Sequence, residues 1–265
     1  MTIIRIEDPA DPRIAAFRNI RERDLTGREG LFVAEGEVVL RVLASPESRC
    51  RPVSVLLDEK RLEAQRPILE RLPEATPVHV APQAVLDGIA GFHLHRGILA
   101  LGEKPAPLGL DEFLAGLDPT AVVVAASEIG NHDNMGGIFR NAAAFGAAGV
   151  VLDDRCCDSF YRKAIRVSVG AVLRTPTVTG VSGIAMIEGL KRAGFEVIAL
   201  VPSADEELAA IPRRDRQAIV LGPEGPGLGP ELIRRCRPAG IRMSGGFDSL
   251  NVGTAGAVAL YQLTR

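Results

Sequence analysis

The chain has 265 residues, enough for one large domain or two smaller ones. Its residues are 46% hydrophobic and 24% charged, a composition typical of a globular protein rather than a disordered or membrane-spanning chain. The formal net charge of −2 excludes a strong overall positive field, so any binding of nucleic acid must depend on local basic patches.

The cysteines and the N-terminal residues indicate the cellular compartment. The four cysteines have neither CxxC spacing nor a histidine pattern, so we expect structural thiols and no metal site. Residues 1–8 lack the apolar core of a signal peptide, and no apolar run is long enough to span a bilayer. The sequence therefore predicts a protein of the reducing cytoplasm.

The first hundred residues predict a small α/β/α unit, because short apolar strands alternate with amphipathic helices. An arginine-rich polar segment over residues 13–28 precedes the first predicted strand. The predicted elements are strands over 31–36, 53–57, 78–80 and 97–101, and helices over 37–43 and 61–72. Residues 103–109 hold two prolines and a glycine and form the clearest linker, so we place the domain boundary between 104 and 105.

The rest of the chain, residues 105–265, alternates more regularly. The predicted elements are strands over 121–125, 149–152, 195–200, 217–222 and 240–243, and helices over 134–145, 162–169, 184–193, 230–236 and 251–263. The strands are almost entirely apolar, which is typical of strands that are buried on both sides. The fold class is therefore α/β, with a parallel sheet covered by helices on both faces.

A polar loop follows the first strand of this second domain. Loops at the carboxyl ends of parallel strands are where α/β proteins hold their sites. We expect Asn134 to cap the following helix. Arg140 comes about two turns later in a helix of otherwise small and apolar residues. It either extends to a solvated edge or presents a guanidinium to a phosphate or a hydroxyl group.

Two further loops carry similar chemistry. Glu224 lies among the glycines of Gly222-Pro223-Glu224-Gly225, whose spacing fits neither a dinucleotide fingerprint nor a P-loop. Ser249 and Asn251 precede a helix of small residues, where they either cap free N–H groups or hold a ligand at the positive helix end. Three such loops on one sheet favour a composite pocket.

Taken together, these loops resemble the SPOUT methyltransferase superfamily, in particular its SpoU (TrmH-like) branch of RNA ribose 2′-O-methyltransferases. Asn134-x-Gly136-x-x-x-Arg140 is similar to the first motif of that branch, and Gly222-Pro223-Glu224-Gly225 to the second. Ile241-x-Met243, followed by Ser249-Leu250-Asn251-Val252, is similar to the third. The resemblance extends from about residue 122 to the end, although Asn141 stands where threonine is common.

The N-terminal unit, residues 1–104, resembles the ribosomal-protein-L30e-like RNA substrate-binding domain that is often fused to this branch, most clearly at 95–100. For residues 105–265 the resemblance implies a catalytic domain with a C-terminal trefoil knot. It further implies a pocket for S-adenosyl-L-methionine. The implied cofactor-binding residues are Leu200, Gly222, Glu224, Gly225, Ile241, Met243 and Leu250.

By the same resemblance, Arg140 acts on the ribose 2′-hydroxyl that accepts the methyl group, either as its base or as the group that orients it. We favour orientation and stabilisation of the developing alkoxide, because arginine is protonated at any ordinary pH. Four other residues of the motifs are implied to shape the catalytic site: Asn134, Glu224, Ser249 and Asn251.

RNA is the implied partner, and tRNA and rRNA both remain open. A cluster of cations after the first motif is either a solvated face or an RNA-binding patch; it comprises Arg155, Arg162, Lys163 and Arg166. The last helix either packs in the core or forms the contact of a homodimer. Two other functions remain open: a protein that binds RNA or S-adenosylmethionine without turnover, and a nucleotide-dependent metabolic enzyme.

Overall fold

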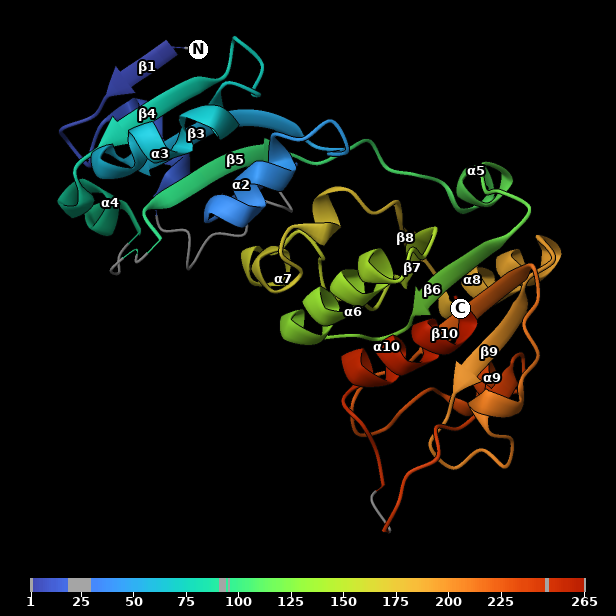
Figure 1. Ribbon diagram of the computed structural model, residues 1–265. Helices are drawn as coiled ribbons and strands as arrows, with labels where there is room; N and C mark the ends of the chain where they lie inside the picture. The colour runs from blue at the N-terminus through green and yellow to red at the C-terminus, as the bar shows by residue number, and fades with distance from the viewer. Residues whose placement is uncertain (1, 19–29, 91–93, 95, 246–247, 265) are drawn as a thin grey trace. The chain divides into compact units, whose positions relative to one another are not determined.

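The computed structural model describes residues 2–18, 30–90, 94, 96–245 and 248–264. The chain divides into two compact units, shown with their elements in Figure 1. The first unit comprises Met1–Pro105 and Asp158–Arg174, and the second comprises Ala106–Cys157 and Thr175–Arg265. The return of Asp158–Arg174 to the first unit is a feature that the sequence analysis did not predict.

The first unit contains a five-stranded mixed sheet with strand order β1-β4-β3-β5-β2. Strand β5 runs antiparallel to its neighbours β3 and β2, whereas β1, β4 and β3 pair in parallel. The elements are β1 (Thr2–Arg5), β2 (Leu31–Glu35), α2 (Glu37–Leu43), β3 (Arg51–Asp58), α3 (Leu62–Leu69), β4 (Pro77–Ala81), α4 (Gln83–Ala90), β5 (Ile98–Glu103) and α7 (Arg162–Val167), with short 3-10 helices at Pro12–Phe17, Glu59–Arg61 and Ala171–Leu173. The predicted α/β class of this unit is confirmed, while β1 and α4 were not predicted.

The arginine-rich segment is described only in part. Arg13 donates to the carboxylate of Asp11, and Arg18 donates to the carbonyl oxygens of Pro9 (3.0 Å) and Asp11 (2.7 Å). These two guanidinium groups therefore hold the chain around the first 3-10 helix. The remaining arginines of the segment, Arg21, Arg23 and Arg28, lie outside the described residues, as does His95.

The segment Asp158–Arg174 is held in the first unit by a buried ion pair and by apolar packing. Arg162 Nη1 donates to Glu35 Oε2 at 2.5 Å, and the Glu35 side chain is only 8% exposed. Ile165 and Leu173 are fully buried in the same core as the strands of this unit. A buried carboxylate is costly without a charged partner, so Arg162 has a structural role here.

The second unit contains a six-stranded sheet with strand order β11-β9-β10-β6-β7-β8, and every pairing in it is parallel. The strands are β6 (Ala121–Ala126), β7 (Gly149–Asp153), β8 (Thr177–Val181), β9 (Glu196–Leu200), β10 (Arg216–Leu221) and β11 (Arg237–Ala239). The helices are α5 (Leu110–Ala115), α6 (His132–Ala144), α8 (Gly183–Arg192), α9 (Pro230–Ile233) and α10 (Val252–Leu263), with a 3-10 helix at Leu208–Ala210. The predicted parallel α/β sheet is confirmed.

Helices cover both faces of this sheet. Apolar residues of α5, α8 and α9 share one core with alternate residues of the strands, so these helices lie on one face. Helices α6 and α10 lie side by side on the other face (Figure 1). Asn141 Nδ2 donates to Gly253 O at 2.7 Å, and a Cβ added at Gly137 would lie 4.0 Å from the Cα of Gly253. The two helices therefore meet at Gly137 and Gly253, near their N-terminal ends.

Several predicted boundaries were wrong. The last strand is Arg237–Ala239 rather than 240–243, because Gly240 leaves β9 and exchanges backbone hydrogen bonds with the segment that contains Glu206 and Leu208. The predicted helix over 230–236 ends at Ile233. Helix α5 and strand β8 were not predicted, and the trefoil knot stays a prediction. Within the described ranges, no helix has the length and apolarity needed to cross a membrane.

Candidate functional site

A cavity of about 540 Å³ opens at the carboxyl edge of the parallel sheet. Its walls come from the loops that follow β9, β10 and β11 and from the segment before α10. These strands are neighbours in the sheet and run in the same direction, so their carboxyl ends meet at this edge. All the residues predicted to bind the cofactor line it: Leu200, Gly222, Glu224, Gly225, Ile241, Met243 and Leu250.

The loop after β10 depends on glycine. A Cβ added at Gly222 would lie 2.7 Å from the backbone nitrogen of Leu228, closer than real Cβ atoms approach other atoms. Gly225 and Gly227 have φ values of 86° and 69°, in the left-handed region that glycine adopts without strain. The tight turn brings backbone to the pocket wall and places Glu224 on it.

Asn251 connects the three motifs through one side chain. Its Oδ1 accepts hydrogen bonds from Gly253 N (2.9 Å) and Thr254 N (3.2 Å), which makes it the N-cap of α10. Its Nδ2 donates to Asn134 Oδ1 (2.9 Å) and to Glu224 Oε1 (3.0 Å). The predicted cap is therefore confirmed, and the same amide also joins the loops of the first and second motifs.

Asn134 does not cap α6, contrary to the prediction. The N-cap is Asn131, whose Oδ1 accepts from Asp133 N at 2.7 Å, so the helix starts earlier. The loop before it is anchored by the buried Asp153, which accepts from Ser127 Oγ (2.5 Å) and from the backbone nitrogen of Glu128 (3.0 Å). Because Asn134 lies inside the helix, its buried side chain is free of capping and accepts from Asn251.

The other two predicted catalytic residues, Ser249 and Arg140, are exposed and do not take part in the hydrogen bonds of Asn251. Ser249 is exposed and lines the cavity, where its hydroxyl donates to Asp248 at 3.3 Å. Arg140 is exposed on α6 and is not among the described lining residues. No hydrogen bond or ion pair joins it to any residue that the structure describes. Its guanidinium is thus available to a ligand outside the cavity itself.

The charge of the cavity is informative about its ligand. Two carboxylates, Glu224 and Asp248, belong to the lining, and the described lining residues include no lysine, arginine or histidine. Such a wall disfavours the phosphates of a nicotinamide dinucleotide or of ATP and favours a ligand with positive charge. The arrangement can therefore hold a cationic ligand against backbone and acidic side chains.

The four cations predicted to bind RNA have different surroundings. Arg155 forms an ion pair with Glu128 at 2.7 Å, although its own side chain is 68% exposed. Arg162 is bound to the buried Glu35, and Arg166 lies 3.8 Å from the same carboxylate. Lys163 and Arg166 are exposed on α7.

The thiols are structural. All four cysteines are free. Burial raises the pKa of Cys50 and of Cys156 to about 12, and that of Cys236 to about 11. The raised pKa values favour the protonated thiols at neutral pH, which is typical of structural rather than nucleophilic cysteines. Cys156 contacts Ala126 O and Ile129 N at 3.4 Å, which helps to hold the loop after β6.

Comparisons with known proteins agree with this geometry. The profile of the SpoU rRNA Methylase family matches residues 121–261. An uncharacterized tRNA/rRNA methyltransferase of Mycobacterium bovis is 36% identical over 272 residues, which cover 97% of this chain and 90% of that protein. Two solved structures share the fold. An S-adenosylmethionine-bound rRNA methyltransferase from Sinorhizobium meliloti has a TM-score of 0.81 and 21% identity, covering 98% of this chain and 97% of that one. An RNA 2′-O ribose methyltransferase has a TM-score of 0.78 and 24% identity, with the same coverage of 98% and 97%.

Proposed function

Because the chain belongs to the SpoU rRNA methylase family, we propose that it transfers the methyl group of S-adenosylmethionine to a ribose 2′-hydroxyl of tRNA or rRNA. One observation carries the proposal. The Asn251 amide joins Asn134 and Glu224 at an acidic cavity, so the three motifs of the family converge on one site. The mycobacterial relative named above is described as an uncharacterized tRNA/rRNA methyltransferase, and one structural neighbour is an RNA 2′-O ribose methyltransferase.

The cavity fits S-adenosylmethionine in charge and size. The cofactor carries a sulfonium and an ammonium against a single carboxylate, so its net charge is positive, as the acidic wall requires. About 540 Å³ lies within the range usual for sites of small molecules and cofactors. Backbone groups at Gly222, Ile241 and Leu250 hold the adenosine, and Leu200 and Met243 line it. When bound, the cofactor supplies a methyl group on a positively charged sulfur.

The chain's own residues then position the acceptor. Arg140 orients the ribose hydroxyl or its neighbouring phosphate and stabilises negative charge on the oxygen as its proton leaves. Asn134, Glu224, Ser249 and Asn251 shape the site and keep the reacting groups in line. Holding reactants in line can supply much of the acceleration of a displacement reaction.

Residues 1–104 serve as an L30e-like RNA substrate-binding domain in this proposal. Arg96 of this range supports it, because it is exposed and its side chain packs against Gly36; the exposed cations on α7, which lies outside this range but in the same compact unit, add to the support. A Cβ added at Gly36 would lie 2.8 Å from Arg96 Cδ, and the φ of Gly36 is 90°. In this proposal, Lys163 and Arg166 bind RNA phosphates. Arg155, which belongs to the second unit and is paired with Glu128, also binds a phosphate. Arg162 has an indirect role, because it holds the buried carboxylate of Glu35.

Lys163→Gln and Arg166→Gln are each expected to weaken RNA binding and to reduce the slope of log affinity against log salt by about 1. The reason is that each loses one phosphate contact and the counterion that it releases. Filter binding of bulk tRNA and of rRNA fragments at several salt concentrations measures the slope. The matched control is Arg66→Gln, an exposed arginine paired with Glu63 on α3. A slope equal to that of the wild type in both α7 variants would remove these residues from the interface.

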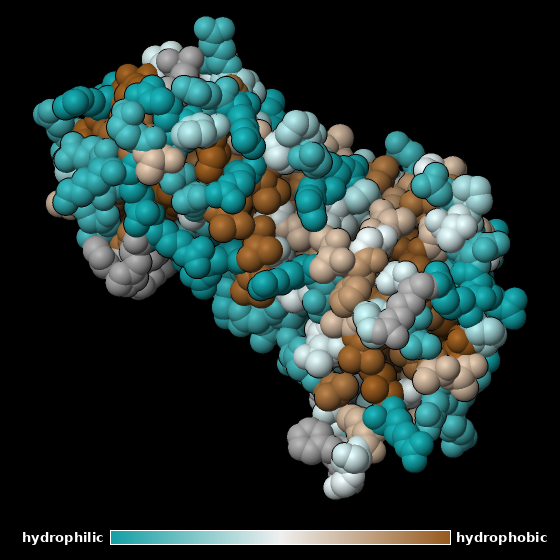
Figure 2. Space-filling model, in the orientation of Figure 1, coloured by the Kyte–Doolittle hydropathy of each residue, from teal (hydrophilic) through white to brown (hydrophobic). Residues whose placement is uncertain are grey.

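The protein is further proposed to be a homodimer through the outer face of α6 and α10. Val258 is 41% exposed and Tyr261 is 46% exposed on α10, and the ring of Tyr261 packs edge-on against Phe145 at 6.1 Å. Figure 2 shows apolar surface where these helices face the viewer. Exposed apolar patches of this kind mark interaction sites.

A cytoplasmic location belongs to the same proposal and rests on the four free thiols.

Val258→Asp combined with Tyr261→Asp is expected to convert the dimer to a monomer, because two charges would be buried in an apolar contact. Sedimentation velocity measures the mass in solution. The control is Val38→Asp, which alters a valine of the first unit that is 46% exposed. A wild-type protein that sediments as a monomer, or a double variant that remains dimeric, would contradict the assignment.

Two measurements test the proposed activity. Calorimetry is expected to detect binding of S-adenosylmethionine and no binding of NAD or ATP. Transfer of a labelled methyl group to RNA, followed by mapping of ribose methylation in RNA from cells without the protein, identifies the nucleotide. Binding of the cofactor without transfer to any cellular RNA would favour a binding protein, and binding of NAD or ATP would favour a metabolic enzyme.

A further inference from the structure

The edge strand β11 is short, although the chain that follows it forms part of the cavity wall. It has three residues and, among the described strands, pairs with β9 alone, yet the chain that leaves it forms the cavity wall at Ile241 and Met243. The adjoining part of this wall, Leu200 to Pro202, comes from the end of β9 and the residues after it, and Val201 N donates to Ala239 O at 3.0 Å. A strand of three residues has few hydrogen bonds of its own, so other contacts must set the spacing between these two parts of the wall.

The loop after β9 runs parallel to the residue that follows β11 and is hydrogen-bonded to it. Gly240 N donates to Glu206 O, and Leu208 N donates to Gly240 O, both at 2.8 Å. The contact is tight: a Cβ added at Gly240 would lie 3.3 to 3.5 Å from three carbonyl oxygens of this loop. The loop and the end of the edge strand are therefore joined directly through their backbones.

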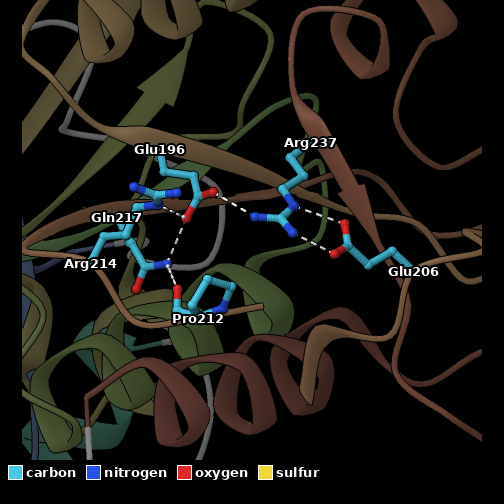
Figure 3. A network of polar contacts seen from close by, with 6 residues as sticks. All are labelled: Glu196, Glu206, Pro212, Arg214, Gln217 and Arg237. Carbon is cyan, nitrogen blue, oxygen red and sulfur yellow. Dashed lines mark hydrogen bonds and ion pairs between the residues drawn. The ribbon is translucent and has the colours of Figure 1, made fainter. Parts of the chain in front are cut away.

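Arg237, the first residue of β11, is the centre of the polar network in Figure 3. Its Nη1 donates to Glu196 Oε1 on β9 at 2.7 Å. Its Nε donates to Glu206 Oε2 at 2.8 Å, and its Nη2 donates to the other oxygen of that carboxylate. Paired N–H groups on one carboxylate form the strongest and most directional type of ion pair. One guanidinium thus connects the edge strand, its neighbouring strand and the loop.

The network continues into the interior of the sheet. Gln217 on β10 is fully buried, and its Nε2 donates to Glu196 Oε2 at 2.9 Å and to Pro212 O at 3.1 Å. Arg214 lies 3.4 Å from the same glutamate oxygen. The hydrogen bonds from Arg237 hold the pKa of Glu206 below its usual value, so both carboxylates face positive charge. Glu196 is therefore held on three sides, and Arg237 is bound to a rigid part of the sheet.

We propose that Arg237 is a positioning residue for the cofactor: it fixes the loop after β9 and the edge strand β11 as one body and so sets the spacing of the cavity walls that they carry. This inference rests on the proposed function, since the cavity is taken to bind S-adenosylmethionine. Arg237 is not among the described lining residues and acts through Leu200 to Pro202 on one side and through Ile241 on the other.

Arg237→Gln is expected to weaken the binding of S-adenosylmethionine about ten-fold, measured by calorimetry on the full-length protein without RNA. In methylation assays, KM for the cofactor is expected to rise by a similar factor, while kcat and KM for RNA stay close to the wild-type values. Glu206→Gln leaves Glu196 and its buried partners intact and is expected to give the same pattern if Arg237→Gln does not fold. Arg237→Lys keeps the charge but cannot offer paired N–H groups, so its affinity should be intermediate.

The control is Arg192→Gln, which removes a surface ion pair of the same unit, 3.6 Å from Asp111, and should leave all three parameters unchanged. Wild-type cofactor affinity in folded Arg237→Gln or Glu206→Gln would overturn the inference, as would a fall in kcat with no change in KM for the cofactor. If the wild-type protein does not bind S-adenosylmethionine, the proposed function itself fails, so the two failures are distinguishable.

Discussion

Arg140→Ala is expected to lower kcat for RNA methylation by about 100-fold or more, the usual effect of removing a group that stabilises a developing oxyanion. The affinity for S-adenosylmethionine should remain within about two-fold of the wild type, because Arg140 is not among the residues that line the cavity. The stability of the fold should also change little, since the side chain is exposed and makes no hydrogen bond to a described residue. Single-turnover methylation with saturating cofactor measures the chemical step.

Two variants refine this result. Arg140→Lys keeps the charge and loses the planar arrangement of donors, so its rate should lie between those of the wild type and the alanine variant. Arg192→Gln serves as the control for loss of an exposed arginine from the same unit. Unchanged methylation of the true RNA substrate by Arg140→Ala would show that the residue has no part in the reaction. A loss seen only in RNA affinity would assign it to substrate binding instead.

Asn251→Ala is expected to weaken binding of S-adenosylmethionine by at least about ten-fold and to lower the free energy of unfolding by about 1 kcal/mol. The cost in stability comes from the cap, because Gly253 N and Thr254 N lose their acceptor. The loss of affinity comes from the bridge, because Asn134 and Glu224 lose the amide that holds them together. Urea denaturation and calorimetry measure the two effects separately.

Asn251→Ser separates the cap from the bridge. Serine caps helices about as well as asparagine, so the stability should stay close to that of the wild type. Its hydroxyl is too short to span the distances that the amide spans, so the cofactor affinity should fall as in the alanine variant. If the serine variant bound the cofactor with wild-type affinity, the cap alone would account for the role of Asn251, and the bridge would be incidental.

Much of the fold was predictable because its signals are local. Buried parallel strands need continuous apolar runs, and these runs predicted β6, β7, β9 and β10 within a residue or two. Where the local signal was weak, the prediction failed: β11 begins with a charged arginine and a proline, and the segment 240–243, which holds Ile241 and Met243, was assigned in its place. The cap of α6 was misplaced because Asn131 and Asn134 offer the same chemistry three residues apart.

The cavity was predictable for a similar reason. The family's motifs record positions that line such a pocket, and a glycine such as Gly222 allows close approach of backbone, so all the predicted lining residues do line the cavity. Contacts between distant segments leave no such signal. Arg162 reads as a surface cation in the sequence, and only the packed first unit pairs it with Glu35, 127 residues away. The role of Arg237 is equally invisible, because both its partners are glutamates on other elements.

By itself, the sequence determined the α/β class, most of the strands and helices, the three polar loops and the family that they resemble, since each depends on residues close together in the chain. Only the tertiary structure decided which side chains meet. It joined Asn251 to Asn134, 117 residues away, and paired Arg162 with the buried carboxylate of Glu35. The physical reason is that the order of the strands and the packing of the helices set the distances between loops. Hydrogen bonds between side chains form only when that packing brings the donor and the acceptor within short range.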